Sequence, residues 1–279
     1  MLSTQNVKSH ALDLKFGGAA LFMESGVLPM IIKQPLYFSP ANEDRTIHIY
    51  LPDDYDKTDE RYPVMYMFDG HNLFYDSDAT YGKSWGMKDF LDSWGKKIII
   101  VGLECSHVGN NRLIEFCPYH WDSFVGPIDG TGDETMRWMV DELKPYIDAN
   151  FRTWAHREAT GIGGSSMGGL MSLYAVIRYN GTYSKAACLS SAISFCGKEL
   201  RQAIDDCPIN PDTKVYLSWG TMESRSARGK AIMAACNKSM NDRLYAKGAQ
   251  PYMYRQVRGR HCEADWEKQV PLFMNFLWR

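Results

Sequence analysis

Ser166 lies at the centre of the pattern Gly164-x-Ser166-x-Gly168, in which a glycine stands two positions before and two positions after a serine. A strand-like run precedes the pattern and a helix-like run follows it, which is the context of a sharp turn that exposes a strained serine beyond a sheet. The first amides and the positive end of the following helix would face an oxygen that gains negative charge. The spacing therefore predicts a nucleophilic serine for acyl transfer. The alternative is a glycine-rich turn with no chemistry.

His261 is the expected base, because a serine hydroxyl becomes an effective nucleophile only when a neighbouring group takes its proton. It follows the last predicted strand and precedes a C-terminal helix, so its loop can reach over the sheet edge toward Ser166. The order serine first, histidine near the end of the sequence, is the one that accompanies this kind of serine turn. A solvated loop histidine is the alternative.

Glu223 is the expected third member of a catalytic triad with Ser166 and His261. A carboxylate in this role fixes the histidine tautomer and stabilises its charged form. It follows the predicted strand 215–219 and lies between Ser166 and His261 in the sequence. A surface glutamate is the alternative. Other carboxylates are less well placed, since they precede the strand, fall at its start or stand beside the histidine as helix N-terminal groups: Asp205, Asp206, Asp212, Glu263 and Asp265.

Two backbone amides are needed to hold the charge that develops on an acyl oxygen. One is the amide of Met167, the residue after the serine, and the second is expected in the loop after the early strand 64–68. Asp69 and Asn72 are expected to pin that loop through hydrogen bonds to backbone groups. The candidates for the second amide are Gly70, His71 and Asn72, and the sequence leaves the choice open.

Most of the sequence alternates strand-like and helix-like segments, which predicts an α/β fold with a mostly parallel sheet covered by helices on both faces. Sites in such sheets form beyond the carboxyl ends of the strands. One domain is expected over residues 31–279, after an extension, residues 1–30, of unknown role. Helices are expected over 136–150, 167–179 and about 264–277, and strands over 46–51, 64–68, 98–103, 160–164, 186–189, 215–219 and 252–257.

The interval 105–133 is loop-like and rich in asparagine, glycine, proline and aromatic residues. Long loops in compact domains usually carry function, so the interval is expected either to cover the sheet irregularly or to form a wall of a substrate site. Trp121 in this interval is a candidate substrate contact, as are Trp85 and Trp219. Such contacts would suit an aromatic acyl group or a sugar ring.

Composition narrows the classes of partner. The formal net charge of −2 gives no electrostatic footprint for nucleic acid or for an anionic membrane, and neither is an expected partner. The seven cysteines are scattered and odd in number, which indicates reduced thiols, and with no signal-peptide pattern the expected location is cytoplasmic. No apolar run approaches the roughly 20 residues that cross a bilayer. No metal or nucleotide motif is complete, so no metal and no other cofactor is expected.

Several segments resemble the putative esterase family of α/β-hydrolases, which includes enterochelin-type siderophore esterases, feruloyl and acetyl xylan esterases, S-formylglutathione hydrolases and mycolyltransferases. The resemblance spans about residues 35–279 and is carried by the segments 45–52, 62–74, 111–115, 141–147, 164–169 and 220–223. It implies the α/β-hydrolase fold, Ser166 as nucleophile, His261 as base and an acid at the position of Glu223. Many members carry aspartate where this sequence has Glu223.

These residues together predict a serine carboxylic ester hydrolase that acts through an acyl-enzyme intermediate. The expected substrate is a small-molecule ester, such as a carbohydrate, aromatic-acyl or siderophore ester. Transfer of the acyl group to an alcohol or sugar by the same site is one alternative, and a non-catalytic binding protein on a hydrolase scaffold is another. The sequence gives no indication of oligomeric state.

Overall fold

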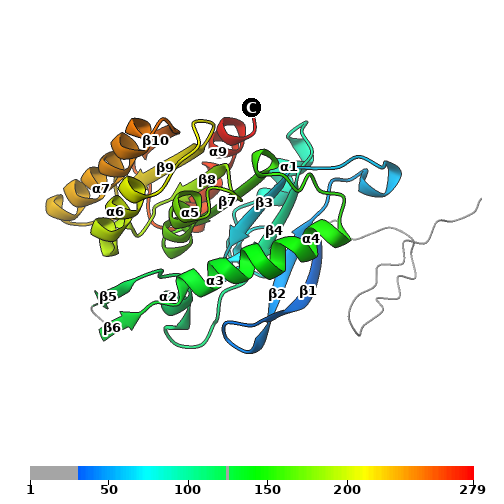
Figure 1. The fold of residues 1–279 in the computed structure, drawn as a ribbon, viewed down its shortest axis with the longest axis horizontal. Coiled ribbons are helices and arrows are strands. Elements are labelled where there is room, and N and C mark those ends of the chain that lie inside the picture. Colours follow the sequence, from blue (N-terminus) through cyan, green and yellow to red (C-terminus); the bar gives the residue numbers. More distant parts are fainter. Residues whose placement is uncertain (1–30, 124–125) are drawn as a thin grey trace, which may run out of the picture.

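Eight strands form one sheet in the computed structural model, which describes residues 31–123 and 126–279 (Figure 1). They are β1 (Ile31–Phe38), β2 (Glu43–Tyr50), β3 (Val64–Phe68), β4 (Ile99–Leu103), β7 (Thr160–Ser165), β8 (Lys185–Leu189), β9 (Lys214–Gly220) and β10 (Gln250–Gln256). Their order is β1-β2-β4-β3-β7-β8-β9-β10, and only β2 runs against its neighbours. The mostly parallel sheet predicted from the sequence is therefore confirmed. The predicted extension, residues 1–30, lies outside the described residues.

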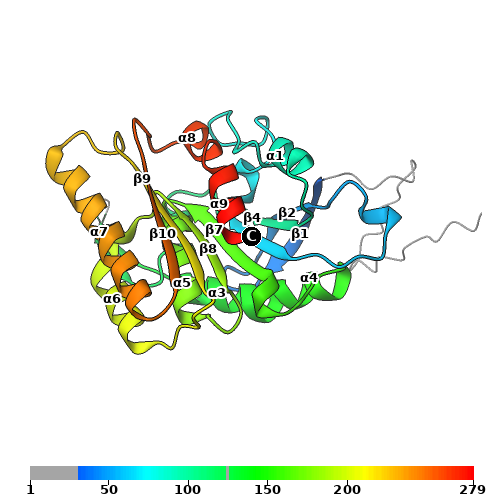
Figure 2. The same cartoon turned by 90° about the horizontal axis from the view of Figure 1, so that it is seen from above.

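Helices cover both faces of the sheet (Figure 2). One face carries α1 (Met87–Ser93), α8 (Glu263–Glu267) and α9 (Val270–Leu277), and the other carries α3 (Gly132–Trp138), α4 (Lys144–Asn150), α5 (Met167–Arg178), α6 (Gly197–Asp206) and α7 (Ala227–Ala246). The strands in the middle of the sheet supply apolar side chains to both layers. Along β3, Tyr66 and Phe68 belong to the core that includes α5, whereas Met65 and Met67 belong to the core that includes α9. This alternation explains why β3 reads as a continuous apolar run.

The interval 105–133 is more regular than expected, and the prediction of a loop is wrong there. It contains the short helix α2 (Asn111–Glu115) and an antiparallel pair, β5 (His120–Ser123) and β6 (Gly126–Asp129), which forms a second sheet apart from the large one. The pair has few apolar residues in alternation, so its pattern is weaker than that of the buried strands. Strand β1 was also missed, and it pairs with β2 along the edge of the sheet.

Prolines modify two of the predicted helices. The segment 132–150 is helical throughout, but Met139–Leu143 forms a π-helical turn between α3 and α4, next to Pro145. The predicted C-terminal helix is divided into α8 and α9, and Pro271 lies in the first turn of α9. Proline lacks the N–H that would continue a helical ladder, so both interruptions are expected at these positions.

Short 3₁₀ turns complete the described elements: η1 (Tyr55–Lys57), η2 (Gly70–Asn72), η4 (Arg157–Ala159) and η5 (Ile193–Phe195). Among the described residues, no helix is both long and apolar enough to cross a membrane.

Candidate active site

One edge of the sheet holds the carboxyl ends of six neighbouring parallel strands, β4, β3, β7, β8, β9 and β10. Each strand is followed directly by a segment that reaches the same region of the molecule. The η2 turn follows β3, Cys105 follows β4, Ser166 follows β7, Ser190 follows β8, Glu223 follows β9 and His261 follows β10. Parallel pairing thus gathers side chains that are far apart in the sequence, as expected for a sheet of this class.

Ser166 connects β7 to α5 with backbone angles φ 56° and ψ −118°. A non-glycine residue rarely adopts a positive φ, so the turn is strained. The Ser166 amide donates a hydrogen bond to the Leu189 carbonyl at 2.9 Å and ties the turn to β8. A Cβ on Gly164 would lie 2.8 Å from the Gly168 backbone, and a Cβ on Gly168 would lie 2.8 Å from the Cβ of Phe68. The two glycines of the pattern are therefore required by close packing around the serine.

His261 and Glu223 form a direct pair, with 2.9 Å between His261 Nδ1 and Glu223 Oε2. The Glu223 side chain is 2% exposed, whereas that of His261 is 43% exposed. Glu223 Oε1 accepts hydrogen bonds from Ser190 Oγ at 2.8 Å and from the Gly220 amide. Trp266 Nε1 donates to the same Ser190 Oγ at 2.8 Å, and its ring meets His261 edge-on. Because an ionised carboxylate only accepts hydrogen bonds, this arrangement favours a proton on Nδ1 and leaves Nε2 unprotonated.

The loops that carry Glu223 and His261 are joined to one another through their backbones. The Thr221 amide donates to the Gln256 carbonyl at 3.0 Å, and the Met222 amide donates to the Gly259 carbonyl at 2.8 Å. A Cβ on Gly220 would lie 2.3 Å from the Gly259 carbonyl oxygen, so a larger residue could not occupy that position. The carboxylate and the imidazole are therefore placed by one joined pair of loops.

Ser166 and His261 line one cavity of about 610 Å³. In the described part of the chain no hydrogen bond joins the two side chains, and catalytic hydrogen bonds often tighten only in a complex with substrate. The wall of the cavity is rich in polar and charged groups, which include Asp69, His71, His107, Arg112 and Glu263. Trp266 is the tryptophan on this wall.

The η2 turn and the start of α5 present backbone amides at the same edge. Asp69 takes a positive φ of 57°, and the Asn72 amide donates to the Asp69 carbonyl at 2.9 Å, so that amide is engaged within the turn. No such partner is found among the described residues for the amides of Gly70 and His71. The Met167 amide opens helix α5, where the first N–H groups have no partner within the helix. Of the three candidates for the second amide, Asn72 is therefore already hydrogen-bonded, and Gly70 and His71 stay predictions.

Two side chains hold the η2 turn in different ways. Asn72 Oδ1 accepts a hydrogen bond from the Thr80 amide at 3.0 Å, as a residue expected to pin the loop should. Asp69, by contrast, bonds to the Arg112 guanidinium through both oxygens at 2.7 Å. Although burial favours its neutral form, the neighbouring Arg112 guanidinium holds the pKa of Asp69 below its usual value. A Cβ on Gly70 would lie 2.5 Å from the Gly102 backbone, so the turn packs directly on β4.

The competing carboxylates are engaged elsewhere or belong to other parts of the wall. Asp205 pairs with Arg243, Asp212 pairs with Arg157, Asp206 accepts from Gln202, and Asp265 accepts from the Arg260 amide and pairs with Lys268. Glu263 is buried in the cavity wall, and burial raises its pKa. Glu223 is the carboxylate that contacts His261 Nδ1.

The three tryptophans predicted as substrate contacts lie outside the residues that line the cavity. Trp85 is 2% exposed and packs against Trp266 in the core. Trp121, on β5, stacks on Phe195 with 3.9 Å between ring centroids. Trp219 is buried on β9. Aromatic composition alone did not distinguish core packing from ligand contact.

Ser190 and Trp266 were missed by the sequence analysis. Ser190 has a positive φ of 46° directly after β8, and it joins Trp266 to Glu223 by hydrogen bonds. Its place after a buried strand was a usable signal, because that edge was already expected to hold the site. Trp266 follows His261 by five positions, but no pattern in the sequence indicates its partner.

Comparison with known proteins agrees with this geometry. The model of the family described as Putative esterase matches residues 39–274. The chain belongs to this esterase family. Esterase Rv1288 of Mycobacterium tuberculosis is 32% identical over 151 residues, which are 53% of this chain and 29% of that protein. The uncharacterized protein YbbA of Bacillus subtilis is 24% identical over 210 residues, 74% of this chain and 80% of that protein. This esterase-family chain therefore spans under a third of the length of the mycobacterial relative.

Solved structures show the same fold. An IroE-like serine hydrolase from Shewanella oneidensis superposes with a TM-score of 0.70 at 19% identity, covering 88% of this chain and 78% of that one. The enterobactin esterase FES from Shigella flexneri superposes with a TM-score of 0.68 at 15% identity, covering 90% of this chain and 59% of that one. The family match confirms the predicted family, and these structures confirm the predicted fold class.

Proposed function

We propose that this esterase-family chain is a serine carboxylic ester hydrolase in which Ser166 is the nucleophile, His261 the base and Glu223 the acid. The observation that carries the proposal is the distance of 2.9 Å between the buried Glu223 carboxylate and His261 Nδ1. His261 lines the same cavity as the strained Ser166. A carboxylate, an imidazole and a hydroxyl in this relation are the parts of an acyl-transfer triad.

Acylation begins when His261 Nε2 takes the proton of Ser166 Oγ as the oxygen attacks the carbonyl carbon of the ester. The imidazolium that forms has both ring nitrogens protonated, and the Glu223 carboxylate stabilises it through Nδ1–H. His261 then gives its Nε2 proton to the departing alcohol oxygen. The acyl group remains on Ser166 as an ester.

The tetrahedral intermediate carries a negative oxygen between the start of α5 and the η2 turn. We assign its stabilisation to the Met167 amide and to an amide of Gly70 or His71, because these amides lie at this edge and have no backbone partner among the described residues. Removal of one such donor typically costs about 10²–10³-fold in rate. In deacylation, His261 Nε2 takes a proton from water as the water oxygen attacks the acyl carbon, and His261 then returns that proton to Ser166 Oγ as the bond from the acyl carbon to Oγ breaks and the acid is released.

The polar wall of the cavity favours a polar, water-soluble ester as substrate. Charged groups such as Asp69, Arg112 and Glu263 are poorly suited to a long aliphatic chain but can bind hydroxyl, carboxyl or amide groups. A carbohydrate ester, an aromatic-acyl ester or a siderophore ester fits this requirement, and enterobactin esterase and ferulic acid esterase occur among the structural neighbours. The exposure of His261 gives water ready access, which favours hydrolysis over transfer to another alcohol.

The test compares the wild type with Ser166→Ala and with Ser165→Ala, a control that removes the hydroxyl of the adjacent serine in the same cavity wall. Hydrolysis of p-nitrophenyl acetate by Ser166→Ala should fall by about 10⁴-fold or more, and labelling by a fluorophosphonate should disappear. The Ser165→Ala variant should still be labelled by the fluorophosphonate, because Ser166 is intact. A wild type that neither hydrolyses nor labels, or a label that survives in Ser166→Ala, would refute the proposal.

A further inference from the structure

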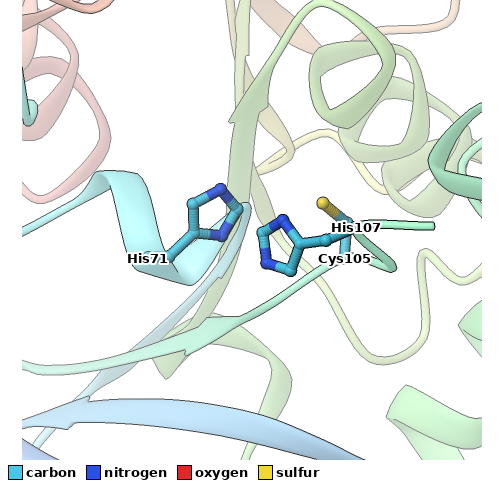
Figure 3. Close-up of side chains that lie close together, drawn as sticks. All are labelled: His71, Cys105 and His107. Carbon is cyan, nitrogen blue, oxygen red and sulfur yellow. The ribbon is translucent and has the colours of Figure 1, made fainter. Parts of the chain in front are cut away.

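Three metal-ligating side chains meet on the cavity wall beside the η2 turn. His71 comes from the turn itself, and Cys105 and His107 come from the segment that follows β4. Each offers one ligand atom, and these three atoms all lie within 4.8 Å of one another. Figure 3 shows the two imidazoles next to each other with the thiol beside them, and the rings meet edge-on. The sequence analysis expected no metal site, because the ligands are divided between two loops and match no spacing motif.

The His71 ring carries an unsatisfied nitrogen in this cluster. His71 is 5% exposed, and its Nε2 lies 3.0 Å from Thr80 Oγ1. Within the described residues, the buried Nδ1 has no hydrogen-bond partner. A buried polar atom without a partner destabilises the folded protein, and coordination to a metal would offset that cost.

The donor set selects the class of cation. Two imidazoles and a thiol suit borderline and soft metals such as Zn²⁺, whereas Mg²⁺ and Ca²⁺ require oxygen ligands. A tetrahedral Zn²⁺ site places its ligand atoms roughly 3.3–3.6 Å apart, so distances within 4.8 Å require a contraction of at most about 1.5 Å. His107 is exposed on its loop and is the member with most room to move.

A carboxylate lies behind the exposed histidine. Glu104 Oε2 is 3.8 Å from His107 Nε2, and Glu104 Oε1 is 2.6 Å from His48 Nε2. In many zinc sites a carboxylate that accepts a hydrogen bond from the imidazole orients it, and a small movement of His107 toward Glu104 would form such a bond. With three protein ligands, the fourth position of the cation would remain open for water from the cavity.

We propose that His71, Cys105 and His107 form a Zn²⁺ site on the wall of the catalytic cavity, and that Zn²⁺ bound there inhibits ester hydrolysis. The inhibition rests on the proposed function, whereas the binding does not. On binding, the Cys105 sulfur forms a bond to Zn²⁺ and its proton leaves to solvent; no oxidation or reduction is involved. The cation would occupy space beside Ser166 and would fix the turn that carries the Gly70 and His71 amides.

Binding is tested with Co²⁺ as a spectroscopic substitute for Zn²⁺, followed by displacement with Zn²⁺. The wild type should bind one Co²⁺ per chain with a sulfur-to-cobalt charge-transfer band. Cys105→Ser should lose that band, and His107→Ala should weaken binding by about 10-fold or more. Cys262→Ser is the matched control, because Cys262 lines the same cavity outside the cluster and its substitution should leave the band intact. Circular dichroism of each variant establishes that it is folded.

The second readout is inhibition, measured for each variant relative to its own metal-free rate. Zn²⁺ should inhibit the wild type and Cys262→Ser, a chelator should restore the rate, and Cys105→Ser and His107→Ala should be inhibited at least about 10-fold less strongly. A wild type without the charge-transfer band, or inhibition that persists undiminished in both variants, overturns the proposal, since the metal would then act elsewhere, for example at His261. Binding by a wild type that hydrolyses no ester would support the metal site and refute the proposed function instead.

Discussion

The two edges of the sheet each border a cavity, but the cavities differ in their chemistry. The carboxyl edge holds the cavity of about 610 Å³ whose wall carries Ser166, His261 and several charged groups. The amino edge holds one of about 290 Å³, whose lining includes three tryptophans, Trp94, Trp154 and Trp278, together with Lys185. A pocket of this kind could be mistaken for a ligand site by its shape, yet no triad of catalytic groups lies among the residues that line it.

Backbone strain at non-glycine residues of the described chain is concentrated at the carboxyl edge. Five described non-glycine residues have a positive φ: Asn42, Asp69, Ser166, Ser190 and Arg258. Asn42 lies in the β1–β2 turn, which extends beyond the carboxyl end of β4, and the other four lie just after β3, β7, β8 and β10 at the same edge. Strained residues persist only where the surrounding structure fixes them, and they concentrate at functional sites. Backbone strain, more than cavity shape, therefore distinguishes the edge that holds the candidate active site. Substitutions at the carboxyl edge should lower ester hydrolysis, whereas a substitution at the amino edge should change stability alone.

Glu223→Gln should have the largest effect among the supporting residues. The Gly220 amide and Ser190 Oγ both donate to Glu223 Oε1, so the glutamine carbonyl would take that place and its NH₂ would face His261 Nδ1. His261 would then hold its proton on Nε2 and could not act as base. We expect kcat/KM for p-nitrophenyl acetate to fall by about 10³–10⁴-fold.

The control for this variant is its thermal unfolding, which should stay close to that of the wild type because the side chains are isosteric. If kcat/KM of a folded Glu223→Gln variant fell by less than about 10-fold, Glu223 would not be the acid of the triad.

Ser190→Ala should have a smaller effect, since Ser190 acts by positioning Glu223. The change leaves Trp266 Nε1 buried without its acceptor and takes one donor from Glu223. We expect kcat to fall roughly 10-fold with KM unchanged, and stability to fall by about 1–3 kcal/mol. Steady-state kinetics and urea denaturation measure the two effects.

Ser191→Ala is the matched control, because the neighbouring Ser191 hydroxyl is without a hydrogen-bond partner in the described part of the molecule. If both alanine variants behaved alike, the hydrogen bonds of Ser190 would have no special role in placing Glu223.

Lys185→Met, at the amino edge, should leave kcat/KM unchanged and alter stability instead. Burial, with the nearby charge of Lys214, lowers the pKa of Lys185 to about 8. The unfolded chain therefore binds this proton more tightly than the folded protein does, so ionisation of Lys185 opposes folding below about pH 8, and the penalty disappears as the pH rises toward about 10.5.

Urea denaturation of wild type and Lys185→Met at neutral pH and at about pH 10 measures this difference. The variant should gain most over the wild type at neutral pH, and the gain should shrink at high pH. A changed kcat/KM in Lys185→Met would show that the amino edge also affects catalysis. A gain in stability that is independent of pH would exclude the ionisation of Lys185 as its cause.

The parts of the site that the sequence predicted are those that follow from local order along the chain. Gly164, Ser166 and Gly168 lie within one strand–turn–helix unit, and His261 and Glu223 each follow a recognisable strand. These features need no knowledge of which strands are neighbours. The fold class followed from the same alternation of strands and helices.

The unpredicted parts depend on contacts between distant segments. Ser190 meets Glu223 and Trp266 only because β8 lies beside β9 and below α8. Asp69 was expected to bond the backbone, but parallel pairing of β3 and β4 puts Arg112 within its reach. The His71, Cys105 and His107 cluster arises from the same pairing.

The joined loops after β9 and β10 imply a shared susceptibility to local unfolding. Within the described residues, strand β10 is the outer strand of the sheet and pairs with β9 alone. The hydrogen bonds from the Thr221 and Met222 amides reach residues at and just after its end. If β10 detached transiently, His261 would leave Ser166 while Glu223 lost its partner in the same event. Amide hydrogen exchange in β10 would then report the fraction of molecules that are folded elsewhere but unable to catalyse.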